Sequence, residues 1–163
     1  MSGEAGKMVP ALVLESFARN GRVNAALIAA LTADDLTRSN GPDGNTIAEL
    51  LAHMAGFRRG WLSEISPAHA QGLTRASDDA GAPELQAAFE AGDRAALEAV
   101  QAAYAEGRTF EAAYSSDPAH FLQHTIVHDS HHRGQIFTLL RQSGRSAEQM
   151  DEIEEAVWPI WRE

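Results

Sequence analysis

Five histidines within thirteen residues are the strongest chemical feature of this sequence; the segment runs from His120 to His132. His128 and His132 are four residues apart, so on a helix they share one face. Two imidazoles one turn apart can direct their nitrogens to a single point beside the helix, which is the geometry of a metal-chelating pair. Their stripe also carries apolar residues and is expected to face inward; its other members are Phe121, Thr125, Gln135 and Leu139, with His124 at its edge.

A third imidazole comes from an earlier segment. His53 lies at the margin of the apolar face of a predicted helix, about 10 Å from its start at Thr46. His128 and His132 lie about 15 and 21 Å along their own helix from Pro118. If the two helices run in the same direction, the three imidazoles reach a similar depth. Three neutral nitrogen ligands leave positions open for water or substrate, which is the catalytic rather than the structural pattern.

A second interpretation stays open for every histidine. A single inward-facing histidine is usually a core residue with a hydrogen-bonding neighbour, and a pair four residues apart can arise by chance. We expect His120, His131 and His69 to be exposed or packing residues, and no role follows for His124 from its spacing.

The elements that must position these side chains are helical, because apolar residues recur at helical spacing and period-two strand patterns are absent. Four main amphipathic helices without strands predict an all-α bundle. The expected helices cover residues 10–31, 46–65, 93–114, 117–143 and 146–158, with a turn at 32–36, a short helical piece at 83–90 and a long connection at 66–83.

Helix-end signals support several of these boundaries. Thr46 and Ser146 each precede a glutamate or glutamine by three residues, which is the capping-box pattern. Asp117 and Pro118 suit the start of the histidine-rich helix, and Gly144 suits its end.

Length and composition limit the function classes. The 163 residues fit one domain spanning 1–163, and the net charge is 13 − 23 = −10. An acidic surface repels nucleic-acid phosphates, so we expect no nucleic-acid partner.

The sequence has no run of about 20 apolar residues, as a membrane-spanning helix requires, and no apolar run near its start, so we expect no membrane association and a cytoplasmic location. There is no cysteine, so any thiol chemistry needs a sulfur from a second molecule.

Two segments together resemble the DinB family. One is Ala48-Glu-Leu-Leu-Ala-His-Met54, and the other is His124-Thr-Ile-Val-His-Asp-Ser-His-His-Arg-Gly-Gln-Ile136. The likeness covers nearly the whole chain in helix order and length, and its most specific part is the segment from His128 to Ile136.

The resemblance implies a four-helix bundle of up-and-down connectivity in a mirror arrangement, often dimeric, so a homodimer is expected. It also implies a divalent metal held by three histidines, which match His53, His128 and His132 here. Zinc or nickel is expected first, with iron or manganese as further candidates. Characterised relatives include thiol-dependent transferases and isomerases that use mycothiol, bacillithiol or glutathione. This chain has His128 where the maleylpyruvate isomerase branch has a carboxylate.

Three functional hypotheses follow. The first is a thiol-dependent S-transferase or isomerase in which a low-molecular-weight thiol is activated at the metal. The second is metal-dependent hydrolysis at the same open site. The third is a non-catalytic, stress-induced metal-binding protein that works as a dimer.

Five polar residues are candidates to support the site. Gln135, one turn from His132, is expected to act in catalysis by orienting a ligand or water. Glu49 and Asp129 lie within helical reach of His53 and His132 and are candidates to accept their second ring N–H groups. Two arginines are candidates to bind the carboxylates of the thiol: Arg58 and Arg133. For all five, ordinary polarity of a helix surface is the alternative.

Overall fold

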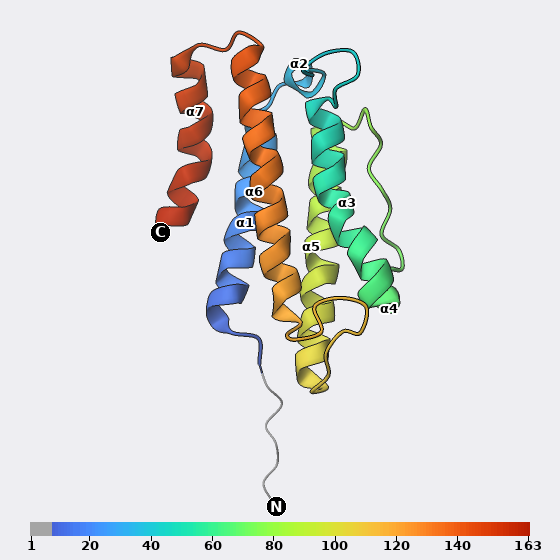
Figure 1. The fold of residues 1–163 in the computed structure, drawn as a ribbon. Helices are drawn as coiled ribbons and strands as arrows, with labels where there is room; N and C mark the ends of the chain where they lie inside the picture. The colour runs from blue at the N-terminus through green and yellow to red at the C-terminus, as the bar shows by residue number, and fades with distance from the viewer. Residues whose placement is uncertain (1–7) are drawn as a thin grey trace, which may run out of the picture.

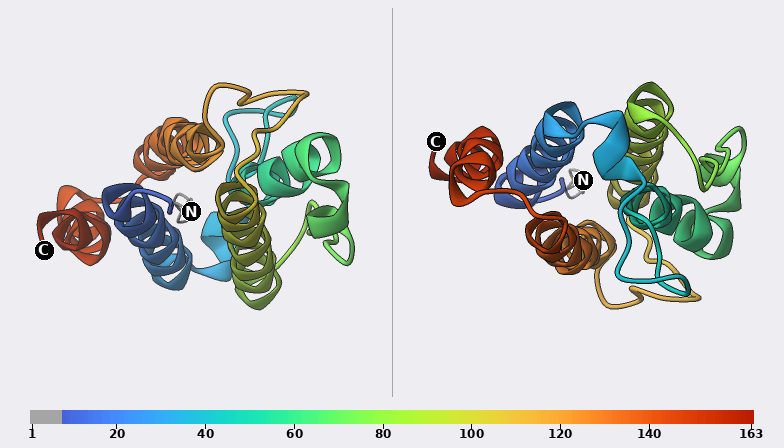
Figure 2. Two further views of the ribbon diagram at one scale, coloured as in Figure 1. Left: turned by 90° about the horizontal axis from the view of Figure 1, so that it is seen from below. Right: turned by 90° about the horizontal axis from the view of Figure 1, so that it is seen from above.

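The structure is a computed structural model that describes residues 8–163, and within that range it is helical without strands. Its elements are α1 (Ala11–Ala30), α2 (Ala33–Leu36), α3 (Ile47–Ile65), α4 (Pro67–Ala70), α5 (Ala82–Ala105), α6 (Ala119–Gln142), α7 (Ala147–Val157) and the 3-10 helix η1 (Trp158–Arg162). Seen end on, the long helices α1, α3, α5 and α6 surround a common centre, and α7 packs outside them against α1 (Figure 2). In the described part of the chain, no helix has the length and apolar character needed to cross a membrane.

The helix-end signals operate as expected. The hydroxyls of Thr46 and Ser146 accept the backbone N–H three residues on, and the side chains of Glu49 and Gln149 accept the N–H of the capping residue in return. Gly144 follows α6 with a φ of +90°, a left-handed conformation that glycine adopts without strain.

The third long helix differs from its prediction. We expected a short piece at 83–90 and a separate helix at 93–114, but α5 is one continuous helix that ends at Ala105. Gly107, with a φ of +64°, and Arg108 direct their N–H groups back to the carbonyls of Tyr104 and Ala103. These two bonds form a Schellman ending, so the chain leaves the helix there and residues 106–118 form a loop.

Helix directions also differ from the expected up-and-down connectivity. Figure 1 shows α1 and α6 running upward, whereas α3, α5 and α7 run downward. Ring contacts agree, because Phe57 lies against Phe121 and His124, while His53, one turn earlier in α3, lies against His132. The expected reversal at every connection is wrong between α3 and α5, because residues 71–81 carry the chain back along the molecule before α5 begins (Figure 1). Consequently α3 and α6 are antiparallel.

A layer of buried polar side chains divides the core into two apolar clusters. One cluster includes Leu27, Leu51 and Ile136, and the other includes Leu62 and Leu122. Each long helix contributes to the layer between them; its buried members are Asn20, Asn24, Arg58, Thr125, Asp129 and Arg133, and the half-buried Asp93 of α5 joins them through its ion pair with Arg58. This layer lies directly behind the histidine-rich face of α6.

Candidate metal centre

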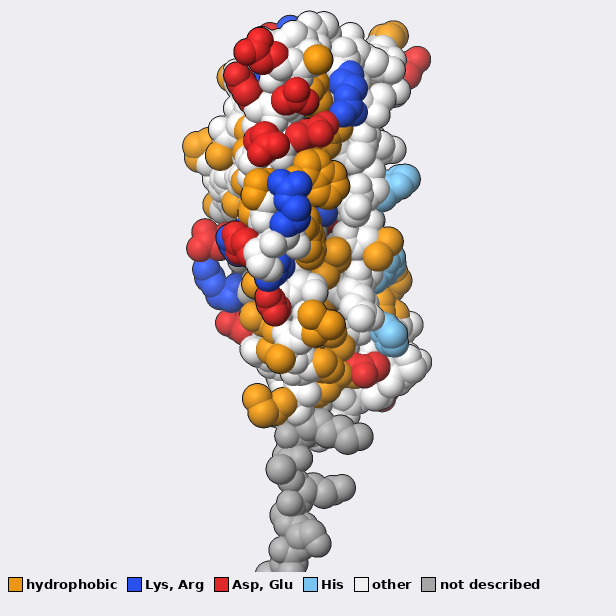
Figure 3. Space-filling view, turned by 90° about the vertical axis from the view of Figure 1, so that its left-hand side faces the viewer, with side chains coloured by type: hydrophobic (Ala, Val, Ile, Leu, Met, Phe, Trp, Pro, Cys, Tyr) orange, Lys and Arg blue, Asp and Glu red, His pale blue; other side chains and the backbone are white. Residues whose placement is uncertain are grey.

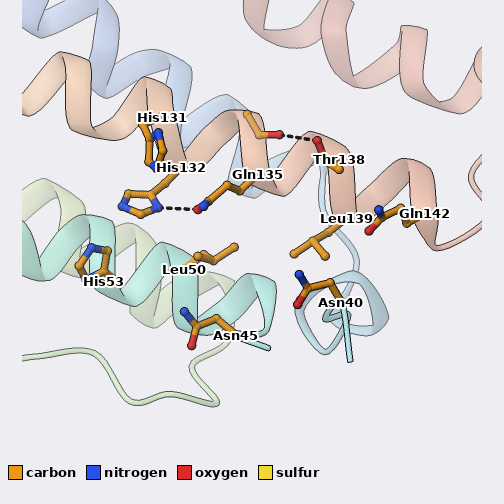
Figure 4. Close-up of a pocket in the computed structure, with 11 residues that line it drawn as sticks. Asn40, Asn45, Leu50, His53, His131, His132, Gln135, Thr138, Leu139 and Gln142 are labelled. Atoms are coloured by element: carbon orange, nitrogen blue, oxygen red, sulfur yellow. Dashed lines mark hydrogen bonds between the residues drawn. The ribbon is translucent and has the colours of Figure 1, made fainter. Parts of the chain in front are cut away.

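The three predicted histidines lie together between α3 and α6. His53, His128 and His132 each offer one ring nitrogen, and these nitrogens all lie within 4.8 Å of one another. The Nε2 atoms of His53 and His128 are 3.2 Å apart. Figure 4 shows His53 on α3 facing His132 on α6.

Antiparallel packing accounts for this convergence. His53 lies about 18 Å from the C-terminal end of α3, and His128 and His132 lie about 14 and 20 Å from the start of α6. Because that end of α3 adjoins the start of α6, the three positions match in depth. Phe57, one turn beyond His53, stacks on the His128 ring with centroids 4.0 Å apart and an interplanar angle of 22°, which limits how that ring can turn.

The donor set fits a divalent transition metal. Nitrogen ligands bind zinc at 2.0–2.1 Å, so two of them on a tetrahedral ion lie about 3.3 Å apart. The 3.2 Å between the Nε2 atoms of His53 and His128 matches this value. Imidazole suits zinc, nickel, copper and iron alike, so the donor set does not choose among them.

Gln135 holds one ligand candidate in a single tautomer. Its Oε1, which can only accept, lies 2.7 Å from His132 Nδ1. His132 therefore donates from Nδ1, and its Nε2 keeps the lone pair that a metal needs. Figure 4 shows this bond at the edge of the cavity.

His128 has a different support. Its Nδ1 is buried and has no hydrogen-bond partner among the described residues, and it lies 3.8 Å from Asp129 Oδ1. We expected Asp129 to serve His132, but its carboxylate lies by His128. A small movement of the His128 ring would convert this 3.8 Å approach into an N–H···O bond.

Asp129 itself is held from several sides. Arg58 donates to both of its oxygens at 2.7 and 2.6 Å, and the side-chain amides of Asn20 and Asn24 donate to Oδ2 at 2.8 Å each. Burial alone would raise the pKa of Asp129, but the charge and hydrogen bonds of Arg58 outweigh burial and hold that pKa far below its usual range. A charged carboxylate therefore stands permanently behind His128.

Partial desolvation lowers the pKa of two of the imidazoles. Desolvation lowers the pKa of His53, and the neighbouring His132 and His128 lower it further. Burial also lowers the pKa of His132, although the hydrogen bond to Gln135 opposes this effect. Neutral imidazole is the form that binds metal, so both shifts favour ligation at neutral pH.

Three of the expected supporting residues lie away from the site's open side. Arg58 is 0% exposed, and its hydrogen bonds go to Asp129, Asp93 and the carbonyl of Met54. Arg133 is 8% exposed and donates to Asn20 and Asn24 on α1. Glu49 caps α3 rather than contacting His53. The structure thus gives the two arginines structural partners in the polar layer.

The remaining histidines do not join the group of three. His124 Nδ1 lies 2.8 Å from the hydroxyl of Tyr114, and His131 packs edge-on against His132. His120 and His69 make local contacts to Gln123 and Ser66.

Two hollows meet at His53. An amide-lined cavity of about 530 Å³ includes His53, His132 and neutral polar side chains: Asn40, Asn45, Gln135, Thr138 and Gln142 (Figure 4). On the other side of His53, an aromatic cleft of about 450 Å³ is lined by Phe57, Trp61, Glu64 and Arg75 over a floor of small residues.

Sequence reasoning missed Asn20, Asn24 and Asp93, which complete the polar layer. Asn20 and Asn24 are four residues apart on an otherwise apolar face of α1, and this amide pair was the available signal. Asp93 gave no comparable signal, because its partner Arg58 lies 35 residues earlier in another helix.

Comparison with known proteins adds the family. A model of the DinB family matches residues 1–163, the whole chain. Searches of curated proteins and of solved structures found no match. The helical fold and the three-histidine group fit a metal-binding protein of that kind, and the chain belongs to the DinB family.

Proposed function

We propose that this protein binds one divalent metal ion through His53, His128 and His132 and acts as a thiol-dependent S-transferase or isomerase. One observation carries the proposal: three imidazoles converge beside an open cavity, and Gln135 fixes the free lone pair of one of them. A buried structural metal site would have no such cavity. The four-helix bundle of the family and the homodimer are further parts of this proposal, on the resemblance alone, and the cytoplasmic location is a part that rests on the sequence pattern.

The residues around the site have different roles. A bound divalent ion supplies a positive centre that favours the thiolate form of a coordinated thiol. Gln135 holds His132 in the ligating tautomer, and Asp129, fixed by Arg58, would accept from His128 Nδ1 after a small movement of that ring. In the transfer, the sulfur forms a bond to the electrophilic carbon, the leaving group departs with the bonding electron pair, and the thiol proton passes to solvent.

The lining of each hollow favours one of the two substrates, the thiol or the electrophile. Apart from histidine, the amide-lined cavity presents no ionisable side chain, so it suits a thiol rich in hydroxyl or amide groups rather than one that relies on carboxylates. The aromatic cleft suits a flat, apolar electrophile that packs on Phe57 and Trp61. The sulfur must come from the cosubstrate, because the chain contains no cysteine.

Metal content tests the first half of the proposal. The protein purified without added chelator is analysed for metals and compared with His132→Ala and with His131→Ala as the matched control, because His131 is the adjacent exposed histidine. We expect about one ion per chain in the wild type and in His131→Ala, and a large loss in His132→Ala. Equal metal content in the two variants would overturn the site.

Turnover tests the second half. The metal-loaded protein is incubated with mycothiol, bacillithiol or glutathione and a chromogenic aryl halide, and thioether formation is followed. We expect a rate that requires the thiol and is lost in His132→Ala. Turnover that persists without thiol, measured with an ester substrate, would instead indicate a hydrolase. Tight metal binding with no reaction of either kind would indicate the non-catalytic alternative.

A further inference from the structure

A further hollow lies on the opposite side of α6 from the histidines. This tryptophan groove, of about 420 Å³, runs between α1, α6 and the C-terminal segment; its apolar walls are Val23, Ile126, Phe137, Trp158 and Trp161. Trp158 is 52% exposed, which is unusual for so large an apolar side chain. Figure 3 looks on to this side of the molecule and shows hydrophobic side chains gathered there, while histidines appear only along one edge.

Arg133 provides the single charged group in the lining of the tryptophan groove. It is 92% buried, since its exposed fraction is 8%. Its Nη1 donates to the side-chain oxygens of Asn20 and Asn24 at 2.9 and 2.6 Å. Within residues 8–163, no hydrogen bond engages its Nε or Nη2, and the only buried side-chain polar atom without a partner is His128 Nδ1. Nε and Nη2 of Arg133 therefore remain accessible, and the groove is where that side chain meets open space.

No carboxylate in the described residues forms an ion pair with Arg133. The nearest acid along α6, Asp129, is bound by Arg58, which takes both of its oxygens. Arginine stays protonated in proteins, so a positive charge with two free donors stands at the base of an aromatic groove. A carboxylate that accepts from both donors would satisfy them in the geometry that guanidinium favours.

The surroundings limit the charge of such a ligand. α7 carries five acidic residues, Glu148, Asp151, Glu152, Glu154 and Glu155. Figure 3 shows acidic side chains gathered above the hydrophobic side chains of this face. These acids oppose a multiply charged anion, whereas a single carboxylate can be offset by Arg133.

From this arrangement we infer that the tryptophan groove is a binding site for a small monocarboxylate with an apolar or aromatic body. The carboxylate lies against the free edge of Arg133, and the body packs on Phe137, Trp158 and Trp161. The site is separate from the three histidines and does not depend on the proposed function.

Isothermal titration with two matched probes tests the inference. Octanoate and its neutral analogue octanamide are titrated into the full-length protein as purified and again after chelation. We expect saturable octanoate binding, octanamide binding weaker by about tenfold, and the same octanoate affinity with and without metal, because a charge-assisted hydrogen bond is worth about a factor of ten or more. Equal affinities for the two probes, or no octanoate binding, would overturn the inference without touching the metal site.

Variants locate the binding. Arg133→Gln should weaken octanoate about tenfold and leave octanamide unchanged. Arg141→Gln is the control, because Arg141 is exposed and pairs with Glu154 beside the groove; its octanoate affinity should match the wild type. If Arg133→Gln does not melt cooperatively, Trp161→Ala replaces it and should weaken both probes. Unchanged octanoate binding in whichever variant folds would overturn the inference. So would a dimer that dissociates in Trp158→Glu and excludes octanoate, since a second copy would then fill the groove.

Discussion

His128 and Asp129 are neighbours in sequence but belong to regions with opposite properties. On one side of α6, the histidines border open cavities, and some of their ring nitrogens lack hydrogen-bond partners among the described residues. Behind them, Asp129 accepts four hydrogen bonds from Arg58, Asn20 and Asn24 and has no exposed surface.

This difference indicates that the buried layer has a structural role, whereas the histidine group is able to bind a ligand. A group whose partners are all inside the protein can hold a structure but has little left to offer a ligand. The histidine group keeps free lone pairs next to open space, so it can exchange partners. The buried polar layer supports the open site, because its hydrogen bonds and ion pairs fix the backbone of α6 and the charge of Asp129 behind the histidines.

The largest effect on stability is expected when the buried cation, Arg58, is removed. Arg58→Ala leaves the buried Asp129 and the half-buried Asp93 without their counter-ion, which we expect to lower the free energy of unfolding by about 3–5 kcal/mol. Urea unfolding followed by circular dichroism measures the loss. Arg94→Ala is the control, because the side chains of Arg94 and Glu90 are both mostly exposed, and it should cost less than about 1 kcal/mol. Similar small losses in both variants would remove the distinction between the two regions.

Metal removal should affect stability less than loss of Arg58. If metal at about 100 times its dissociation constant stabilises the fold by about 2.7 kcal/mol, chelation should lower the melting temperature by about 5–10 °C. The helical signal of the metal-free protein should persist at 25 °C, because the polar layer and both apolar clusters remain. Loss of that signal on chelation would mean that the metal, rather than the buried layer, holds the fold.

Gln135 tests how far the open site depends on its own support. Gln135→Ala frees the tautomer of His132, and loss of such a supporting partner typically lowers metal affinity about 10- to 100-fold. A competition titration with a metal indicator gives the affinity. Gln142→Ala, which borders the same cavity without bonding to a histidine, should bind metal as the wild type does. An equal effect of the two substitutions would show that the His132–Gln135 bond does not matter.

Acidification provides the mildest perturbation. The folded protein lowers the pKa of His53 and His132 below the ordinary value of 6.5, so at that pH the neutral form of each ring still predominates. Metal affinity should therefore change little from pH 8 to 6.5 and should decline below it, as protons begin to compete for the ring nitrogens. The same indicator titration, repeated across this range, measures the change. A decline that is already steep above pH 7 would contradict the lowered pKa values.

Much of the helical layout could be predicted from local signals. The capping boxes at Thr46 and Ser146 and the glycine stop at Gly144 act within one helical turn, so neighbouring residues suffice to specify them. The end of α5 was missed although it is also local: Gly107, the left-handed residue that ends the helix, lies inside the range 93–114 that was predicted to be helical.

The three histidines predicted for the candidate site lie together in the structure, but the argument that brought them together assumed the wrong helix direction. Spacing placed His128 and His132 on one face of a helix, and that inference needs only the helical period. The match in depth with His53 was argued for parallel helices, whereas α3 and α6 are antiparallel. His53 lies about 18 Å from the end of α3 that adjoins the start of α6, so the antiparallel arrangement gives the closer match in depth with His128 and His132.

Sequence alone therefore determined what depends on near neighbours: helical periodicity, caps, the acidic surface, the absence of cysteine and the pairing of His128 with His132. Only the tertiary structure decided that Arg58 belongs to the core, that Asp129 stands behind His128, and that Arg133 faces a groove away from the histidines. These features join residues that are far apart in the chain. Their geometry follows from helix direction and packing, because the partner of a buried charge is set by which helices pack together and not by the residues beside it in sequence.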